Sequence, residues 1–277
     1  MTFHAKLHAI QRSNNSLLCI GLDTDVKKIP AFLRRKKNAQ IDFNKQIIDA
    51  TRDLVCAYKI NMAFYEAEGE RGWSAIRETL RIAPTSVVCI ADAKRGDIGN
   101  SSERYAEIFL QKLKFDAVTI SPYMGKDSVL PFLHSPEQCV FLLALTSNPG
   151  AKDFQRLKVG KKFLYEKVIE TAMTWPGKKN IGFVVGATNA KELRSVRKIA
   201  HNAPLLIPGV GAQGGSVKTS VQYGCNQNGE MAIINASRSI LYASGGEDFA
   251  EAARKEATKI RDEINFWREK FFKRRDL

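Results

Sequence analysis

A dense run of ionisable residues, DAKRGD at positions 92–97, directly follows the apolar run Ser86 to Ala91. Asp92 and Lys94 are two positions apart at the end of this expected strand, so their side chains should leave it on the same face. Lys59 ends another apolar run and is their natural neighbour. The resulting Lys-Asp-Lys-Asp array consists of Lys59, Asp92, Lys94 and Asp97. Such an array can transfer protons and stabilise developing charge, or it can be a purely structural network of salt bridges.

A second candidate site is the glycine-rich stretch PGVGAQGG at positions 208–215, together with Arg238. A glycine-rich turn that leads into a helix exposes backbone N–H groups to an anion. Arg238 adds a planar fork of donors that suits phosphate oxygens. We therefore predict that Gly214, Gly215 and Arg238 bind a phosphate group. The alternatives are that the two glycines only form a tight turn and that Arg238 pairs with a surface carboxylate.

Eight short apolar runs recur along the chain with helical patterns between them, which is typical of βαβ units around a parallel sheet. The expected strands are Leu17 to Leu22, Val55 to Ile60, Ser86 to Ala91, Ala117 to Ser121, Cys139 to Leu145, Ile181 to Val185, Leu205 to Pro208 and Met231 to Asn235. Near-continuous apolar runs suit strands that are covered on both faces. We predict an α/β fold, a single (β/α)8 TIM barrel domain over residues 1–277, because barrels of this kind have a similar length.

Two helices can be placed in more detail. Apolar residues between Ser102 and Lys114 fall on one helical face, and Asn100 or Ser101 would serve as the N-cap of that helix. Apolar residues between Glu247 and Phe272 recur every three or four positions, which predicts a C-terminal helix that closes the barrel. The long connection from Asn148 to Lys179 is a candidate lid.

A (β/α)8 barrel places its chemistry at the C-terminal ends of the strands. Polar or charged residues follow at least six of the eight runs at that point: Asp23, Lys59, Asp92 with Lys94, Ser147, Gln213 and Arg238. One end of the barrel would therefore collect both the charge array and the phosphate site.

The segment DAKRGDIGN at positions 92–100, together with Lys59 in Tyr58-Lys59-Ile60-Asn61, resembles orotidine 5'-monophosphate decarboxylase, in its longer bacterial-type branch. Four further motifs follow strands in the expected order: Gly21-Leu22-Asp23, LTSNPG at 145–150, PGVGAQGG at 208–215 and Asn235-Ala236-Ser237-Arg238. Related barrels share the first motif, whereas five motifs in the right order are specific. The likeness covers most of the chain.

The resemblance implies that a pyrimidine nucleotide loses the carboxylate at C6 as CO₂. Lys94 would stabilise the developing carbanion and then donate the proton that replaces CO₂. Asp92 would lie beside the departing carboxylate, while Lys59 and Asp23 would position the ribose hydroxyls. No cofactor and no metal are expected.

The resemblance also implies a homodimer with shared active sites, in which Asp97 and the neighbouring Ser101 reach the site of the partner. Ser101 has the competing role of an N-cap. Ser147 would hydrogen-bond the amide edge of the pyrimidine, and Gln213 would connect that loop to the phosphate loop. Asn61 is expected beside the substrate.

The composition, with 44% hydrophobic and 26% charged residues, excludes disordered, collagen-like and disulfide-scaffold proteins. The net charge of +14 suggests an anionic partner, whether a phosphorylated substrate, a nucleic acid or an acidic membrane, unless it only aids solubility. The five widely spaced cysteines include no CxxC pair, which disfavours a disulfide framework and a metal centre. Neither a cleavable signal nor a membrane span is expected, so we predict a soluble, cytoplasmic protein.

Two other functions stay open on the sequence. A sugar-phosphate decarboxylase or aldolase on the same barrel would use Mg²⁺ to stabilise an enediolate. Such relatives are expected to carry an acidic residue in place of Lys59. A catalytically silent barrel that binds nucleotides or nucleic acid would explain the charge and would bind polynucleotides in a salt-sensitive way. The intact charge array and the lack of an aromatic-interleaved basic motif disfavour it, so we expect no nucleic-acid and no membrane partner.

Overall fold

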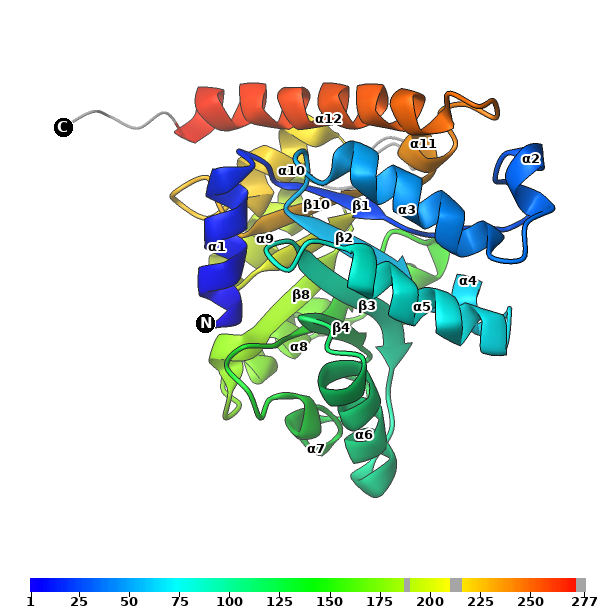
Figure 1. The fold of residues 1–277 in the computed structure, drawn as a ribbon. Coiled ribbons are helices and arrows are strands. Elements are labelled where there is room, and N and C mark those ends of the chain that lie inside the picture. The colour runs from blue at the N-terminus through cyan, green and yellow to red at the C-terminus, as the bar shows by residue number, and fades with distance from the viewer. Residues whose placement is uncertain (187–189, 210–215, 273–277) are drawn as a thin grey trace.

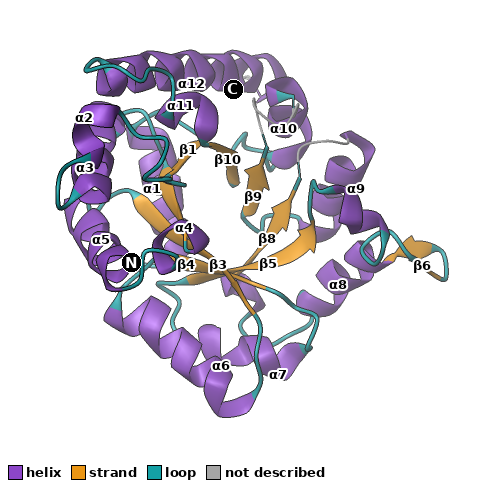
Figure 2. Ribbon diagram, turned by 90° about the vertical axis from the view of Figure 1, so that its right-hand side faces the viewer, coloured by secondary structure: helices purple, strands orange, loops and turns teal. Residues whose placement is uncertain are grey.

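The structure, a computed structural model, describes residues 1–186, 190–209 and 216–272. Parallel strands form a closed barrel in the order β1-β10-β9-β8-β5-β4-β3-β2 (Figure 2). Their bounds are β1 (Leu18–Gly21), β2 (Ala57–Asn61), β3 (Val88–Arg95), β4 (Ala117–Ile120), β5 (Cys139–Leu145), β8 (Ile181–Val185), β9 (Leu205–Pro208) and β10 (Ala232–Ala236). Each corresponds to one of the expected apolar runs, so the predicted (β/α)8 barrel is confirmed.

Helices surround the barrel and cover the outer faces of the strands (Figure 2). The longer ones are α3 (Ala39–Thr51), α5 (Glu70–Ile82), α6 (Gly99–Ala106), α8 (Leu164–Ala172), α9 (Ala190–Ala200), α10 (Val217–Gly224) and α12 (Phe249–Phe272). Single turns of helix are α2 (Ala31–Arg34), α4 (Ala63–Glu66), α7 (Lys126–Val129) and α11 (Arg238–Leu241). Short 3-10 segments cover Leu130–Phe132, Pro149–Lys152 and Lys178–Asn180. Strands with one face toward this ring and the other toward the barrel interior are buried on both faces, which explains their continuous apolar sequences.

The C-terminal helix α12 lies where the sequence predicts it. It packs between α3 and α10, against the outside of β1. Its buried face consists of Phe249, Ala253, Ala257, Ile260 and Ile264, which recur at helical spacing. This helix therefore covers the seam where the first strand pairs with the last, β10.

The helix after β3 differs from the prediction. It begins at Gly99 with Ile98 at the N-cap, so the predicted N-cap role of Asn100 or Ser101 is wrong. It also changes into a π-helix over Glu107–Lys112. Two adjacent residues of this wider turn, Phe109 and Leu110, are both buried. A regular α-helix with one narrow buried face would not bury two neighbours in this way.

An N-terminal helix, α1 (Phe3–Ser13), crosses the end of the barrel at which the strands begin (Figure 1). The ring of Phe3 meets Phe141 of β5 edge to face, with centroids 6.1 Å apart. The Lys6 ammonium pairs with Asp116 at 2.6 Å, and Gln11 Nε2 donates to the carbonyl of Ala232 at 2.8 Å. Helix α1 therefore closes the end of the barrel opposite to the candidate site.

The connection from Asn148 to Lys179 contains a two-stranded hairpin, β6 (Lys158–Val159) and β7 (Lys162–Phe163), followed by α8. The hairpin lies outside the ring of helices, beyond α8, and points away from the barrel mouth (Figure 2). This arrangement does not support the lid that the sequence suggests for the segment. Across the described ranges, no helix has both the length and the apolar character that a membrane span requires.

Candidate active site

A cavity of about 390 Å³ opens at the C-terminal ends of the barrel strands. It brings together residues that the sequence places after different strands. The predicted site residues that line it are Asp23, Lys59, Asn61, Asp92, Lys94, Ser147 and Arg238. Loops from across the barrel therefore meet at one place, as this fold requires of its sites.

The centre of the site is a set of four linked charges. Lys59 Nζ donates to Asp23 Oδ1 at 3.2 Å and to Asp92 Oδ2 at 2.9 Å. Lys94 Nζ donates to the other oxygen of Asp92 at 2.6 Å. The Lys59 side chain is only 5% exposed, whereas that of Lys94 is 49% exposed. The array thus has a buried cation that holds it together and an accessible cation that faces the cavity.

Burial and charge act in opposite directions on these groups. Burial lowers the pKa of Lys59. The carboxylates of Asp92 and Asp23 together raise that pKa by more, so its net shift is upward. Burial raises the pKa of Asp92, but Lys59 and Lys94 together lower that pKa by more, so its net shift is downward. Both groups are therefore charged throughout the neutral range.

The end of strand β3 is irregular at the point where it supplies these charges. Its register with β4 shifts between Ala91 and Arg95, and Lys94 has a left-handed φ of 48°. For a residue with a Cβ this conformation costs about 1–3 kcal/mol, and such strain concentrates at functional sites. Asp92 and Lys94 line the same cavity as expected, but through a bulged strand rather than the regular alternation on which the prediction was based.

The loop that carries Asp23 is held by two tyrosines. Tyr65 Oη donates to the carbonyl of Leu22 at 3.0 Å. Tyr242 Oη donates to the carbonyl of Asp23 at 3.1 Å and accepts from the amide of Asp25 at 2.9 Å. Together these bonds fix the backbone from which the Asp23 carboxylate reaches Lys59.

Gly21, at the end of β1, shows why this motif contains glycine. A Cβ at this position would lie 2.0 Å from Ser237 Oγ and 3.1 Å from Asn235 Oδ1. Both of those residues line the cavity. The absence of a side chain at Gly21 therefore allows the loop after β10 to approach β1 closely.

The structure describes only some of the residues that are predicted to bind the phosphate. Arg238 begins α11 and lines the cavity beside Ser237 and Gly209. Three further candidates, Gln213, Gly214 and Gly215, lie outside the described residues. The structure thus supplies one cation at the edge of the mouth, next to the start of the glycine-rich stretch.

Asp97 and Ser101 are not among the residues that line the cavity. The Asp97 carboxylate accepts from the amide of Ile98 at 2.9 Å, and Ser101 is exposed on α6. Exposed apolar side chains lie on the same loop and on the next one, at Ile98, Tyr123 and Met124. Within this chain, Asp97 therefore is not part of the four linked charges that line the cavity.

Several residues of the mouth were not singled out from the sequence: Thr146, Asn148, Asn235 and Ser237. All four belong to the motifs at the ends of strands β5 and β10. The sequence therefore indicated where they lie in the barrel but not that they line the cavity. Thr119 of β4 does not line the cavity but is fully buried next to the charge array; it was not singled out because it lies within an apolar run.

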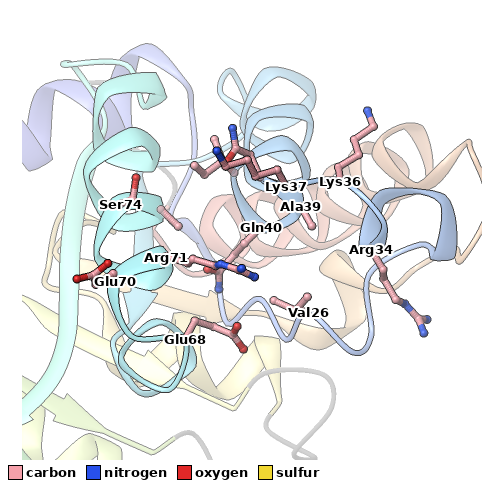
Figure 3. Close-up of a pocket in the computed structure, with 13 residues that line it drawn as sticks. Val26, Arg34, Lys36, Lys37, Ala39, Gln40, Glu68, Glu70, Arg71 and Ser74 are labelled. Atoms are coloured by element: carbon pink, nitrogen blue, oxygen red, sulfur yellow. The ribbon is translucent and has the colours of Figure 1, made fainter.

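A second cavity, of about 340 Å³, lies outside the barrel mouth between α3 and α5. Its cations, Arg34, Lys36, Lys37 and Arg71, are mixed with Glu68 and Glu70. Figure 3 shows that Arg34 and Lys36 point away from α5, so the cations do not converge on one point. The amide of Gln40 already donates to the carbonyl of Thr24. The barrel mouth is therefore the candidate active site.

Comparison with known proteins identifies the family to which this barrel belongs. A family model described as "Orotidine 5'-phosphate decarboxylase / HUMPS family" matches residues 16–255. The chain belongs to this family. The resemblance that the motifs indicate is thereby confirmed.

The curated relatives include a protein named orotidine 5'-phosphate decarboxylase from Dehalococcoides mccartyi, 49% identical over 98% of this chain and 100% of its own. Another with the same name, from Christiangramia forsetii, is 50% identical over 90% of this chain and 92% of its own. Among solved structures, that of Leishmania donovani OMP decarboxylase aligns with a TM-score of 0.82 and 37% identity, over 96% of this chain and 99% of that one.

Proposed function

We propose that this protein converts orotidine 5'-monophosphate to uridine 5'-monophosphate and CO₂, a step of de novo pyrimidine biosynthesis, and is thus a carboxy-lyase. The observation that carries the proposal is the array of Lys59, Asp92 and Lys94 at the mouth of the barrel. The family match over residues 16–255 and the names of the relatives support it.

The chemical problem is the charge left behind by CO₂. When the bond between C6 and the carboxylate breaks, its electron pair stays on C6, and the pyrimidine has no electron sink attached there. In our proposal the ammonium of Lys94 stabilises this carbanion and then transfers a proton to C6. Lys94 is suited to the role because it is the accessible cation of the array. Solvent then restores its proton.

Asp92 holds Lys94 in place and would lie beside the departing carboxylate. Repulsion between the two anions would fall as CO₂ leaves. We assign Asp92 to the site without a share of the rate, because ground-state destabilisation is disputed as a source of catalysis. Lys59 keeps Asp92 ionised and in position from the buried side.

The remaining residues would bind the nucleotide. We assign Asp23 and Lys59 to the ribose hydroxyls and Ser147 and Asn61 to the side of the base. Arg238, with Gly214 and Gly215, is assigned to the phosphate, and Gln213 to the connection between the loop of Ser147 and the phosphate loop. Binding energy from the phosphate can be used to organise a reaction centre several bonds away.

The proposed reaction uses no metal and no cofactor. Lys59 Nζ already occupies the space between the carboxylates of Asp23 and Asp92, where a divalent cation would otherwise bind. An ammonium there opposes Mg²⁺ by charge and by volume. This favours the decarboxylase over a magnesium-dependent sugar-phosphate enzyme on the same barrel.

We also propose that two copies form a homodimer, with Asp97 and Ser101 of each reaching the site of the other. The position of Asp97 away from its own cavity, beside exposed apolar side chains, supports this. We further propose that the chain acts as a single domain in the cytoplasm. Its five cysteines are unpaired and buried, as is common in reducing compartments.

The test is the loss of ultraviolet absorbance when purified protein is mixed with orotidine 5'-monophosphate in the presence of EDTA. We expect rapid loss for the wild-type protein, and nearly none for Lys94→Ala, which should still bind uridine 5'-monophosphate. Turnover by Lys94→Ala near the wild-type rate would contradict the proton-donor role. A folded protein that binds the nucleotide but needs Mg²⁺ to turn over a sugar phosphate would overturn the proposal in favour of the second enzyme class.

A further inference from the structure

Thr119 of β4 lies directly behind the Asp92 and Lys94 pair. Its side chain is fully buried, and it is not among the residues that line the cavity. Its Oγ1 accepts from the backbone amide of Lys94 at 2.9 Å and donates to Asp92 Oδ1 at 3.0 Å. One hydroxyl therefore joins the main chain of one charged residue to the side chain of the other.

The hydrogen bonds around Asp92 show what this hydroxyl adds. Asp92 Oδ2 accepts from Lys59, while Oδ1 accepts from both Lys94 Nζ and Thr119 Oγ1. A threonine hydroxyl has one proton, so its bond to Asp92 leaves only lone pairs to meet the Lys94 amide. The direction of both bonds is thus fixed, and each bond polarises the other.

The backbone of Lys94 requires such a partner. The pairing of β3 with β4 is interrupted between Ala91 and Arg95, so the Lys94 amide lies in the irregular stretch of the ladder. The amide instead bonds to the Thr119 side chain, and regular pairing resumes at Arg95 with Ile120. Thr119 therefore holds Lys94 at its left-handed φ of 48°.

We infer that Thr119 is a positioning residue for the reaction: its hydroxyl fixes the Lys94 backbone and the Asp92 carboxylate relative to each other. The inference rests on the roles proposed above for those two residues. Because Thr119 does not face the cavity, its loss should affect turnover and leave nucleotide affinity nearly unchanged. The hydroxyl is the group that matters, since serine supplies it equally and valine keeps the shape without it.

The experiment compares Thr119→Val with Thr119→Ser. We expect Thr119→Val to lower kcat about 10- to 100-fold, because small misplacements of a reacting group have effects of that size. KM and the Kd for uridine 5'-monophosphate should stay within about threefold, since the binding groups themselves remain. Thr119→Ser should keep kcat within about threefold of the wild type. If Thr119→Val does not fold, Thr119→Ala replaces it with the same expectation.

A second measurement tests the proton transfer by Lys94 separately from decarboxylation. Exchange of the C6 proton of uridine 5'-monophosphate in D₂O, followed by NMR, requires proton transfer at C6 but no carboxylate on the substrate. Exchange should slow in Thr119→Val and recover in Thr119→Ser. A merely structural loss would change the folded fraction and not the exchange rate of each folded molecule.

A control variant, together with the Lys94→Ala test, separates the possible failures. Thr51→Val removes another fully buried threonine hydroxyl, which bonds to the Ile47 carbonyl in α3, and should leave kcat unchanged. Wild-type kcat in Thr119→Val, or equal losses in the serine and valine variants, would overturn the inference. If Lys94→Ala itself kept its turnover, the proposed role of Lys94 would fail first, whatever Thr119 does.

Discussion

Lys59 and Lys94 belong to one charge array but have opposite surroundings. Lys59 is 5% exposed and donates to two carboxylates, whereas Lys94 is 49% exposed and donates to Asp92 alone. A proton removed from Lys59 would leave two carboxylates without their shared cation. The exposed lysine with one partner is therefore the one suited to meet a substrate atom, and the enclosed one is suited to hold the site together.

Lys59→Met should destabilise the protein in a way that depends on pH. At pH 7 the variant leaves Asp23 and Asp92 with one fewer cation in a buried setting, and we expect a loss of about 3 kcal/mol in the free energy of unfolding. The lowered pKa of Asp92 contributes stability that is complete above its unfolded pKa of about 4 and is lost as pH falls through the folded value. The raised pKa of Lys59 contributes below about pH 10 and is lost as pH rises through its folded value.

Urea unfolding of both proteins at pH 7 and pH 3 measures this dependence. The difference between wild type and Lys59→Met should be smaller at pH 3 than at pH 7. The control is Arg254→Met, which breaks the exposed pair with Asp53 and should cost at most about 1 kcal/mol. An equal difference at both pH values would mean that Lys59 stabilises the fold by packing and not by its charge.

The residues that sequence alone could place are those whose polarity interrupts an apolar pattern. Asp92, Lys94 and Ser147 follow apolar runs, so the barrel rule assigns them to the mouth. Thr119 lies inside such a run, and its β-branched side chain is ordinary for a strand. Its role depends on the bulge in β3, which no local pattern indicates.

At the scale of elements, Tyr242 connects two parts of the site. It follows α11, the turn of helix that begins with Arg238, and its hydroxyl bonds to the loop after β1. Its ring stacks on Phe43 of α3, which orients the hydroxyl toward that loop. The helix on the proposed phosphate side and the loop of Asp23 are therefore braced by one side chain.

Tyr242→Phe should weaken nucleotide binding more than it slows the chemical step. The variant removes one bond donated to the Asp23 carbonyl and one accepted from the Asp25 amide. We expect KM to rise about three- to tenfold, in line with about 1 kcal/mol for a lost hydrogen bond, with kcat changed by less than twofold. Steady-state kinetics measures both constants.

Tyr105→Phe is the matched comparison for Tyr242→Phe. Tyr105 contributes the face of its ring to the Arg95 guanidinium, at 5.2 Å, and that contact survives removal of the hydroxyl. Its KM should stay at the wild-type value. A fall in kcat without a change in KM for Tyr242→Phe would show that the brace acts on the reacting groups instead of on the nucleotide.

The strands were predictable because a barrel buries them on both faces, which requires continuous apolar runs. Helix α1 carried a readable signal as well, with Phe3, Leu7 and Ile10 on one face after a Thr2 cap. The π-helix over Glu107–Lys112 carried none, because a widened turn changes the helical period in the middle of the segment. Its cause lies in packing against the barrel and not in local preference.

At the scale of the whole molecule, a single copy of the chain contains an incomplete version of the predicted array. Lys59, Asp92 and Lys94 are in contact, but Asp97, the fourth member, does not line the cavity and is followed by the exposed apolar side chain of Ile98. A closed dimer with twofold symmetry brings the same surface of both copies together. If that surface is the interface, Asp97 completes the site of the partner.

Mixing two inactive variants tests this arrangement. Lys94→Ala and Asp97→Ala should each be inactive alone. In a mixed dimer, one site carries both defects, while the other has Lys94 from one chain and Asp97 from its partner, and is intact. Random exchange makes half of the dimers mixed, each with one working site of two, so activity should recover to roughly a quarter of wild type.

The matched control mixes Lys94→Ala with Asp92→Ala. Lys94 Nζ and Asp92 Oδ1 are 2.6 Å apart on the same chain. Every site of every mixed dimer therefore lacks one of the two side chains, and activity should stay absent. Native mass spectrometry of the mixtures establishes that subunits have exchanged. Recovery in the first mixture and not in the second requires that a site draws on two chains. Exchange without recovery in either would mean that Asp97 serves its own subunit, and that its loop must move to reach the cavity.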